Sequence, residues 1–334
     1  SQISFLIPKR RFTDVFRSLK YRNYRLFFCG QSISLIGTWM QRVAMSWLVY
    51  RLSNSATMLG IVAFSSQIPT FVLTPLGGVV ADRYNRRQVL LATQIFAMIQ
   101  AVILAVLVLT GVIAVWHLIV LSLILGTINA FDMPTRQSFV VYMIDKREDL
   151  GNAIALNSSM VNVARLIGPL IAGLLIATVG EGICFTINAV SYLVVISTLI
   201  MMSVIQQKNT SKSSAWQEFK DGFSYSIGFA PIKYLIVFLA LLSLTGMPYE
   251  VLLPIFAKDI LGGGSRTFGF LVTATGIGAL AGAFYLAQRK TVLGLGKVMV
   301  DSAVLFGVGL IGFSQSTVMW FSVFCLLLAG LGMI

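Results

Sequence analysis

Ten long apolar stretches, joined by short loops, constrain this chain of 334 residues more than any other feature of its sequence. An α-helix needs about 20 apolar residues to cross a hydrocarbon core of roughly 30 Å. Charged residues make up 11% of the chain, well below the share of about 25% in ordinary globular domains. The chain is therefore predicted to be an all-α polytopic membrane protein. The predicted spans are 26–50, 58–80, 89–109, 113–141, 153–179, 183–205, 232–256, 268–286, 298–313 and 318–334.

The lysines and arginines follow the alternation of the loops. A net charge of +13 would suit a nucleic-acid partner, but most of this charge lies in the amino-terminal tail and in every second loop. The alternate loops contain only Arg51, Lys258 and Arg266. This asymmetry follows the positive-inside rule of membrane proteins, so we expect a cytoplasmic amino terminus. It also explains the basic balance without any nucleic acid.

Cysteine and histidine give no sign of a metal or cofactor site. Cys29, Cys184 and Cys325 each stand alone in an apolar run, and His117 has no partner nearby in the sequence. None of them shows the paired spacing of a metal site. The chain also lacks the GxxxxGK[ST] loop of an ATP-driven pump. No metal and no cofactor are therefore expected.

One polar connector divides the spans into two groups. Residues 206–230 begin with a linker rich in Gln, Lys and Ser and continue with three aromatic residues at helical spacing, which suits an amphipathic helix on the inner membrane surface. We expect an amino-terminal six-helix bundle at 1–205 and an incomplete carboxyl-terminal bundle at 231–334. Paired six-helix halves are common among transporters. Because the sequence ends within a span, about ten of twelve such helices are expected.

The loop between the second and third spans carries a distinctive pattern, Gly78-x-x-x-Asp82-Arg83-x-x-Arg86-Arg87. A glycine permits close helix packing, and an aspartate accepts hydrogen bonds from the start of a neighbouring helix. The arginines would anchor the turn at the inner surface. The positive-inside rule explains these arginines, but it does not explain an aspartate four residues after a glycine. The pattern therefore indicates a conformational role.

This turn resembles the signature between helices two and three of major facilitator superfamily transporters. Three further stretches, GTWMQR at 37–42, GTINAFDMPTRQ at 126–137 and NVARLIGP at 162–169, resemble the bacterial branch with enterobactin exporters and macrolide efflux pumps. The resemblance covers essentially the whole chain. It implies alternating access by rocking of two six-helix bundles. It also implies that Asp82 helps to latch the halves against the start of helix eleven, which we expect to follow the end of this sequence.

The resemblance further implies proton-coupled efflux of an amphipathic small molecule, such as a drug, macrolide or siderophore. The transporter would be a monomer in the lipid bilayer of a bacterial inner membrane. An uptake symporter for a small metabolite is the alternative within transport. A membrane-embedded enzyme or lipid-handling scaffold is the alternative of another class. It would need clustered catalytic polar residues, which the sequence does not show, so we expect no enzyme.

The fifth span carries Gly168, Pro169 and Gly173. Small residues let membrane helices approach closely, and proline bends a helix. These residues loosely resemble the glycine–proline motif on helix five of drug–proton antiporters. Those antiporters usually carry an arginine in the middle of helix four, whereas 121–128 has none here. The residue that couples transport to protons is therefore not assigned by the resemblance.

Charged residues inside the spans are the best candidates for a substrate cavity or for coupling, because one at a helix centre costs about 2.5–3.5 kcal/mol. Arg165 lies about 18 Å into its span, either at a substrate site or in a structural ion pair. For Asp132 and Arg136, four residues apart, we favour a local pair that stabilises the inner gate over proton carriage.

A last pair of charges lies on the first and seventh spans. Arg42 and Glu250 lie about 24 and 27 Å from the inner ends of these spans, at equivalent positions of the two halves. We predict that they meet across the outer gate, where protonation of Glu250 would weaken the pair. The alternative is a hydrated Glu250 at the outer interface.

Overall fold

The computed structural model describes residues 16–203, 224, 228–288 and 294–333, and these residues fold almost entirely into helices. The predicted all-α architecture is confirmed. The first half contains η1 (Arg17–Lys20), α2 (Arg22–Ser53), α3 (Ala56–Arg83), α4 (Arg86–Leu109), α5 (Val115–Phe139), η2 (Val140–Met143), α6 (Arg147–Val179) and α7 (Glu181–Met201). The second half contains α9 (Ala230–Gly246), α10 (Pro248–Ile255), the π-helix η3 (Phe256–Ile260), α11 (Ser265–Gln288), α12 (Leu295–Ser314) and α13 (Met319–Gly332).

Eight helices of the described part of the chain are long and apolar enough to cross a membrane. Two of the ten predicted spans correspond to helices outside this group. Helix α2 has 32 residues, but Arg42 and the buried Gln31 and Gln41 lower its hydropathy. Helix α13 is apolar but has only 14 residues. The aromatic residues of the predicted amphipathic helix, Trp216, Phe219 and Phe223, lie outside the described residues, so this helix stays a prediction.

The seventh predicted span is a discontinuous helix. Helix α9 ends at Gly246, and α10 begins at Pro248 after the single residue Met247. Proline has no backbone N–H to continue the α9 ladder, but it is well suited to the first position of a new helix. The break places Glu250 in the first turn of α10, where the helix dipole favours a negative charge.

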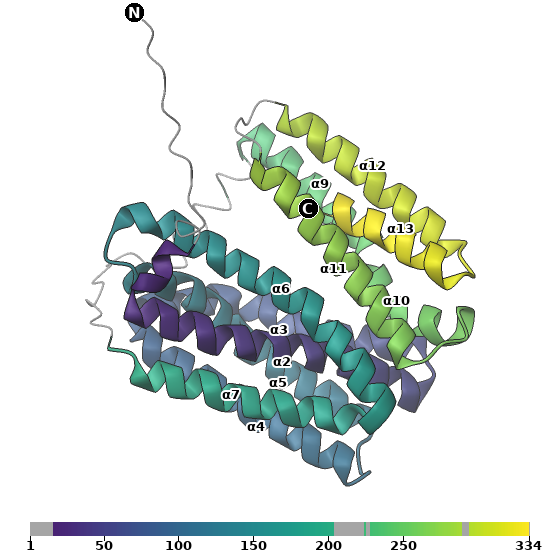
Figure 1. The fold of residues 1–334 in the computed structure, drawn as a ribbon, viewed down its shortest axis with the longest axis horizontal. Coiled ribbons are helices and arrows are strands. Elements are labelled where there is room, and N and C mark those ends of the chain that lie inside the picture. Colours follow the sequence, from purple (N-terminus) through teal and green to yellow (C-terminus); the bar gives the residue numbers. More distant parts are fainter. Residues whose placement is uncertain (1–15, 204–223, 225–227, 289–293, 334) are drawn as a thin grey trace, which may run out of the picture.

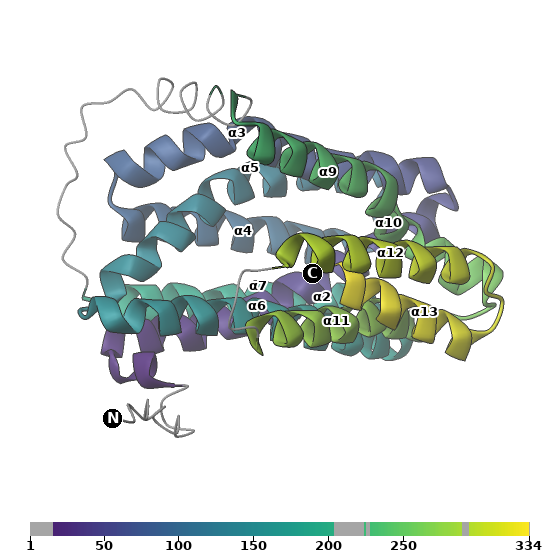
Figure 2. The same cartoon turned by 90° about the horizontal axis from the view of Figure 1, so that it is seen from above.

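The two halves of the molecule meet at one end and diverge towards the other (Figure 1). We call the end that holds η1, the α3–α4 turn and the start of α6 the basic end, and the opposite end, which holds η3, the far end. Figure 1 shows α11 and α12 leaning away from α6 towards the basic end, and Figure 2 shows α10 lying beside the first bundle near the far end. Helices α6 and α11 form the main contact between the halves.

Among the described residues, the buried apolar side chains also connect the two halves at the far end and not at the basic end. Towards the far end, one cluster of buried residues joins both halves, with Leu48 of α2, Leu253 of α10 and Leu271 of α11 among its fully buried members. Towards the basic end, a second cluster contains residues of the first half only, such as Phe27 and Phe139. Burial of shared apolar surface therefore holds the halves together at the far end.

At the basic end, the short helix η1 is fixed to the start of α6 by one carboxylate. Asp149 accepts from Lys20 Nζ at 2.8 Å, from Arg17 Nε at 2.9 Å and from the Tyr21 hydroxyl at 2.7 Å. The hydrogen bond and charge of Asp149 hold the pKa of Lys20 above its usual value. Three donors on one carboxylate form a charge-assisted contact between η1 and α6.

Candidate functional site

A cavity of about 480 Å³ lies between the two halves at mid-depth. Its walls come from α2, α3, α5 and α6 of the first half and from α9, α10 and α11 of the second. Three charged side chains line it, namely Arg42, Arg165 and Glu250. All three were predicted from their charge and depth. Asp132 and Arg136, which were predicted with them, do not line this cavity.

Glu250 forms an ion pair with Arg165 across the two halves. The Arg165 Nη2 atom donates to Glu250 Oε1 at 2.8 Å and also lies 3.6 Å from Met333 Sδ. The predicted pairing of Glu250 with Arg42 is therefore wrong in this structure. Arg42 and Glu250 were predicted to pair because they lie at similar distances from the inner ends of their spans. In the structure, Arg165 of α6 also lies close enough to reach Glu250. For Arg165, the predicted ion pair is present, and its role at a substrate site stays a prediction.

Arg42 lies beside this ion pair without joining it. Its guanidinium carbon is 4.5 Å from the centroid of the Trp39 ring, and the Arg165 guanidinium carbon is 5.6 Å from the same ring. A guanidinium over an indole face is attracted by the ring quadrupole. Trp39 therefore lies against both arginines and limits their orientation in the cavity wall.

At the far end of the molecule, α2 and η3 are joined by residues that the sequence did not single out. The Tyr50 hydroxyl donates to Asp259 Oδ2, and Lys258 Nζ donates to Asn54 Oδ1 at 2.7 Å. Nearby, the rings of Trp47 and Phe268 stack at 6.0 Å. Adjacent opposite charges at 258–259 in a short loop were the only sequence signal for this contact. These contacts join the end of α2 to η3, and the predicted gating role of Arg42 and Glu250 stays a prediction.

Close backbone approach supports the contact of α6 with both neighbours. A β-carbon on Gly168 would lie 2.5 Å from the Trp39 Cβ of α2, and one on Gly173 would lie 3.0 Å from the Gly269 Cα of α11. Pro169 is buried inside α6 between them. The three residues predicted for helix packing therefore do lie at tight helix contacts, one of which joins the halves.

The predicted switch turn joins four helices of the first half, namely α3, α4, α5 and α7. Arg86 is buried; it pairs with Asp82 at 3.0 Å and donates to Ser138 Oγ of α5 at 3.0 Å. Arg87 donates to the carbonyl oxygens of Leu199 and Ile200 at 2.7 and 2.6 Å, which satisfies the last turn of α7. The Asp82 side chain is 63% exposed, and Arg83 is also exposed.

Close packing at this turn involves Gly77 rather than the predicted Gly78 in this structure, and the role of Gly78 in the conformational switch stays a prediction. Among the described residues, a β-carbon on Gly78 would meet no atom within 4 Å. The preceding residue, Gly77, is buried, and a β-carbon there would collide with the carbonyl oxygen of Ala130 on α5. The spacing of the motif singled out Gly78, whereas the rotation of α3 turns Gly77 towards its neighbour.

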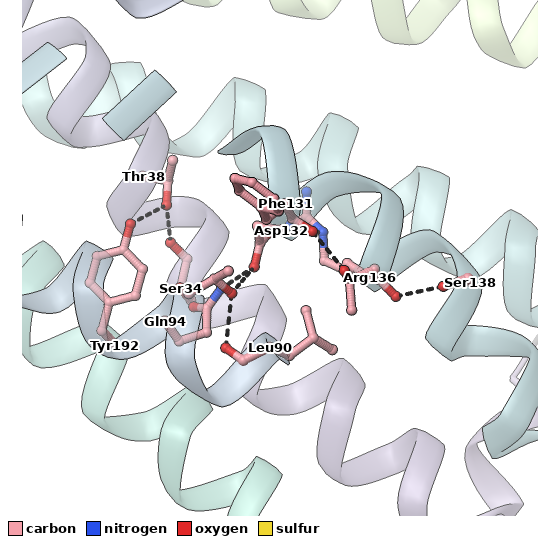
Figure 3. Close-up of polar contacts among 11 residues, drawn as sticks. Ser34, Thr38, Leu90, Gln94, Phe131, Asp132, Arg136, Ser138 and Tyr192 are labelled. Carbon is pink, nitrogen blue, oxygen red and sulfur yellow. Dashed lines mark hydrogen bonds and ion pairs between the residues drawn. The ribbon is translucent and has the colours of Figure 1, made fainter. Parts of the chain in front are cut away.

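Asp132 and Arg136 form the predicted i,i+4 ion pair inside the first half, with Arg136 Nε 3.7 Å from Asp132 Oδ2. The other carboxylate oxygen accepts from Thr93 Oγ1 at 2.9 Å and from Gln94 Nε2 at 2.8 Å, both on α4 (Figure 3). Asp132 is buried, so these donors offset the loss of hydration of its charge. The site joins α4 to α5, and its role at the inner gate stays a prediction.

A buried amide cluster was missed altogether. Gln41 of α2 donates to Gln100 of α4 at 3.0 Å and accepts from Asn188 of α7 at 2.8 Å. Buried amides need such partners, because an unpaired polar group in an apolar environment is costly. Isolated amides within three predicted spans were the only signal in the sequence, and Gln41 also reaches the cavity wall.

The chain is similar in sequence to several known transporters. Residues 13–334 match the family model of the transmembrane secretion effectors. The staphyloferrin A transporter of Staphylococcus aureus is 26% identical over 92% of this chain and 77% of its own length. The enterobactin exporter of Escherichia coli is 24% identical over 92% of this chain and 73% of its own length. The macrolide efflux protein A of Streptococcus pyogenes is 20% identical over 73% of this chain and 62% of its own length.

Solved structures show a similar fold. A bacterial homologue of the iron transporter ferroportin, in an inward-facing state, aligns with a TM-score of 0.64 at 20% identity, over 93% of this chain and 80% of that one. A bacterial homologue of the lysosomal transporter Spinster, also inward-facing, has a TM-score of 0.67 at 14% identity, with coverages of 93% and 72%. These likenesses concern the arrangement of the helices.

Proposed function

Because the chain belongs to the transmembrane secretion effector family of major facilitator superfamily transporters, we propose that it exports amphipathic small molecules in exchange for protons. A drug, a macrolide or a siderophore is the proposed cargo, in line with the names of the relatives. The family and the relatives are transporters and not enzymes. We place the protein in the bacterial inner membrane as a monomer, with its basic end in the cytoplasm.

The observation that supports export best is the one-sided closure of the central cavity. The apolar cluster shared by both halves and the bond from Tyr50 to Asp259 lie at the far end, whereas the apolar cluster at the basic end belongs to the first half alone. A cavity that is closed at the outer end and flanked by diverging halves at the cytoplasmic end suits loading from the cytoplasm. Rocking of the halves around a fixed site is the usual route of alternating access.

Glu250 is the residue that we propose for proton coupling. Its ion pair with Arg165 links α10 of the second half to α6 of the first. Protonation of Glu250 would remove its negative charge and weaken this link between the halves. A proton that enters from the outer side would therefore change the contact that joins the halves beside the cavity.

The α3–α4 turn is the proposed cytoplasmic latch. Asp82 is paired with Arg86 of its own turn but remains largely exposed. It is therefore accessible to a partner from the second half when the basic end closes. Burial of Arg86 and the bonds of Arg87 to α7 would transmit such a contact to the rest of the first bundle.

The experiment is dye transport by the full-length protein in membrane vesicles of known orientation. A panel of amphipathic fluorescent dyes with negative, zero and positive charge would be offered to inverted vesicles with an imposed pH gradient. Export predicts gradient-driven accumulation inside inverted vesicles, abolished by a protonophore. Accumulation only in right-side-out vesicles would identify an uptake symporter instead, and accumulation that is indifferent to the protonophore would refute proton coupling.

A further inference from the structure

We propose that the central cavity is selective for an organic anion with an apolar body, and that Arg42 binds its negative charge. This inference rests on the proposed transport function and names the chemical class of its cargo. It assigns to Arg42 a role in binding rather than in gating.

The charges in the cavity wall do not balance. Two guanidinium groups, those of Arg42 and Arg165, face the cavity together with a single carboxylate, that of Glu250. The carboxylate is held by Arg165 at 2.8 Å. Within the described part of the chain, no carboxylate lies within 4.0 Å of Arg42. One positive charge in the wall therefore has no carboxylate partner within ion-pair distance among the described residues.

A charge without a close ion-pair partner is unusual inside a membrane span, because ionisable groups there normally pair with one another or mark the path of a substrate. The ring of Trp39 attracts the Arg42 guanidinium at 4.5 Å but carries no negative charge. Arg42 is exposed although it belongs to a helix whose neighbouring residues, Gln41 and Val43, are buried. Arg42 also lines the cavity, and a guanidinium offers N–H donors in a fork that suits a carboxylate or another planar anion.

The rest of the wall fits the body of such a ligand. Apolar side chains such as Val62, Leu253 and Phe268 lie among hydroxyl and amide groups such as Thr38, Gln67 and Ser122. A volume of about 480 Å³ lies within the roughly 300–1,000 Å³ typical of small-molecule sites. The site thus combines a cationic anchor, scattered hydrogen-bonding groups and an apolar surface. A cationic ligand of similar shape would meet the repulsion of Arg42.

Equilibrium binding to the purified full-length protein tests this inference with two dyes that share one ring system. The anionic probe is 5-carboxyfluorescein and the cationic probe is rhodamine 123, each followed by fluorescence anisotropy. We expect the wild type to bind the anion at least tenfold more tightly than the cation. Arg42→Gln should weaken anion binding at least tenfold, whereas Arg42→Lys should retain most of it because the charge is kept.

The matched control is Arg25→Gln, which removes one arginine from an exposed position of the same helix, outside the cavity. This variant should bind the anion like the wild type. Unchanged anion affinity in Arg42→Gln, equal affinity for the two dyes, or no saturable anion binding to the wild type would each overturn the inference. Thermal unfolding of the variants, with recovery of binding in Arg42→Lys, separates loss of the charge from loss of the fold.

The proposed export and the proposed anion site can therefore be refuted independently of each other. Anion binding that depends on Arg42, without transport in vesicles of either orientation, would refute the proposed export and support the anion site. Gradient-driven export that Arg42→Gln leaves unchanged for dyes of every charge would support the export and refute the anion site.

Discussion

Replacing Glu250 with glutamine is expected to uncouple transport from the proton gradient. The side chains of Arg165 and Glu250 are 20% and 38% exposed, so their pair lies between two limits. Exposed pairs contribute about 0–1 kcal/mol, whereas loss of one partner of a fully buried pair costs about 3–5 kcal/mol. For this half-buried pair beside a cavity we expect about 2 kcal/mol, which is a roughly 30-fold change in the equilibrium between the two conformations.

The assay is dye efflux from proteoliposomes that contain the full-length protein, with and without an imposed pH gradient. The wild type should be stimulated by the gradient, whereas Glu250→Gln should transport at one rate in both conditions, since glutamine resembles the protonated side chain. Glu148→Gln is the control, because it removes an exposed carboxylate at the basic end of α6. If Glu250→Gln kept the stimulation of the wild type, the proposed role of the ion pair would be refuted.

Three other predictions concern the ends of the molecule and the contact between its halves. Tyr50→Phe removes the donor to Asp259 and should release the far end, which predicts faster labelling of an engineered cysteine at that end by a membrane-impermeant maleimide; an unchanged rate would count against this gate. Gly173→Leu should abolish transport through collision with α11 while the protein still reaches the membrane, and normal transport would show that the contact is dispensable. Lys20→Gln should lower the thermal midpoint. Because Asp149 raises the pKa of Lys20 above 10.5 in the folded state, this deficit should be complete below pH 10.5 and shrink as the pH rises through the folded pKa; a deficit independent of pH would contradict this.

The sequence predicted the helices well. Long apolar runs and alternating basic loops depend only on local composition, so they identify spans without knowledge of their neighbours. Arg42, Arg165 and Glu250 were singled out as charges inside the spans, and all three line one cavity. Their pairing was not predicted correctly, because depth is a property of one helix, whereas pairing depends on how three helices are rotated and packed. Helix α2, which carries Arg42, also contacts α10, so the sequence alone does not tell which arginine reaches Glu250.

The missed features share this dependence on neighbouring helices. Tyr50 and Asp259 are 209 residues apart, and nothing local in either segment indicates the other. Gln41 is one of several amides in the spans, and its importance lies in its partners on α4 and α7. The break at Met247 had a local signal, the following proline, but a proline inside a membrane helix is common and does not by itself predict an interruption.

The contact of Gly173 with Gly269 lies close to one end of α6, which affects how far each end of this helix can move. Gly173 is 26 residues from Arg147 and 6 residues from Val179, or about 39 Å and about 9 Å along the helix axis. If the two bundles rotate about the contact of Gly173 with Gly269, the Arg147 end of α6 moves about four times as far as the Val179 end. A shift of about 2 Å at the Val179 end of α6 would then correspond to a shift of about 8 Å at its Arg147 end.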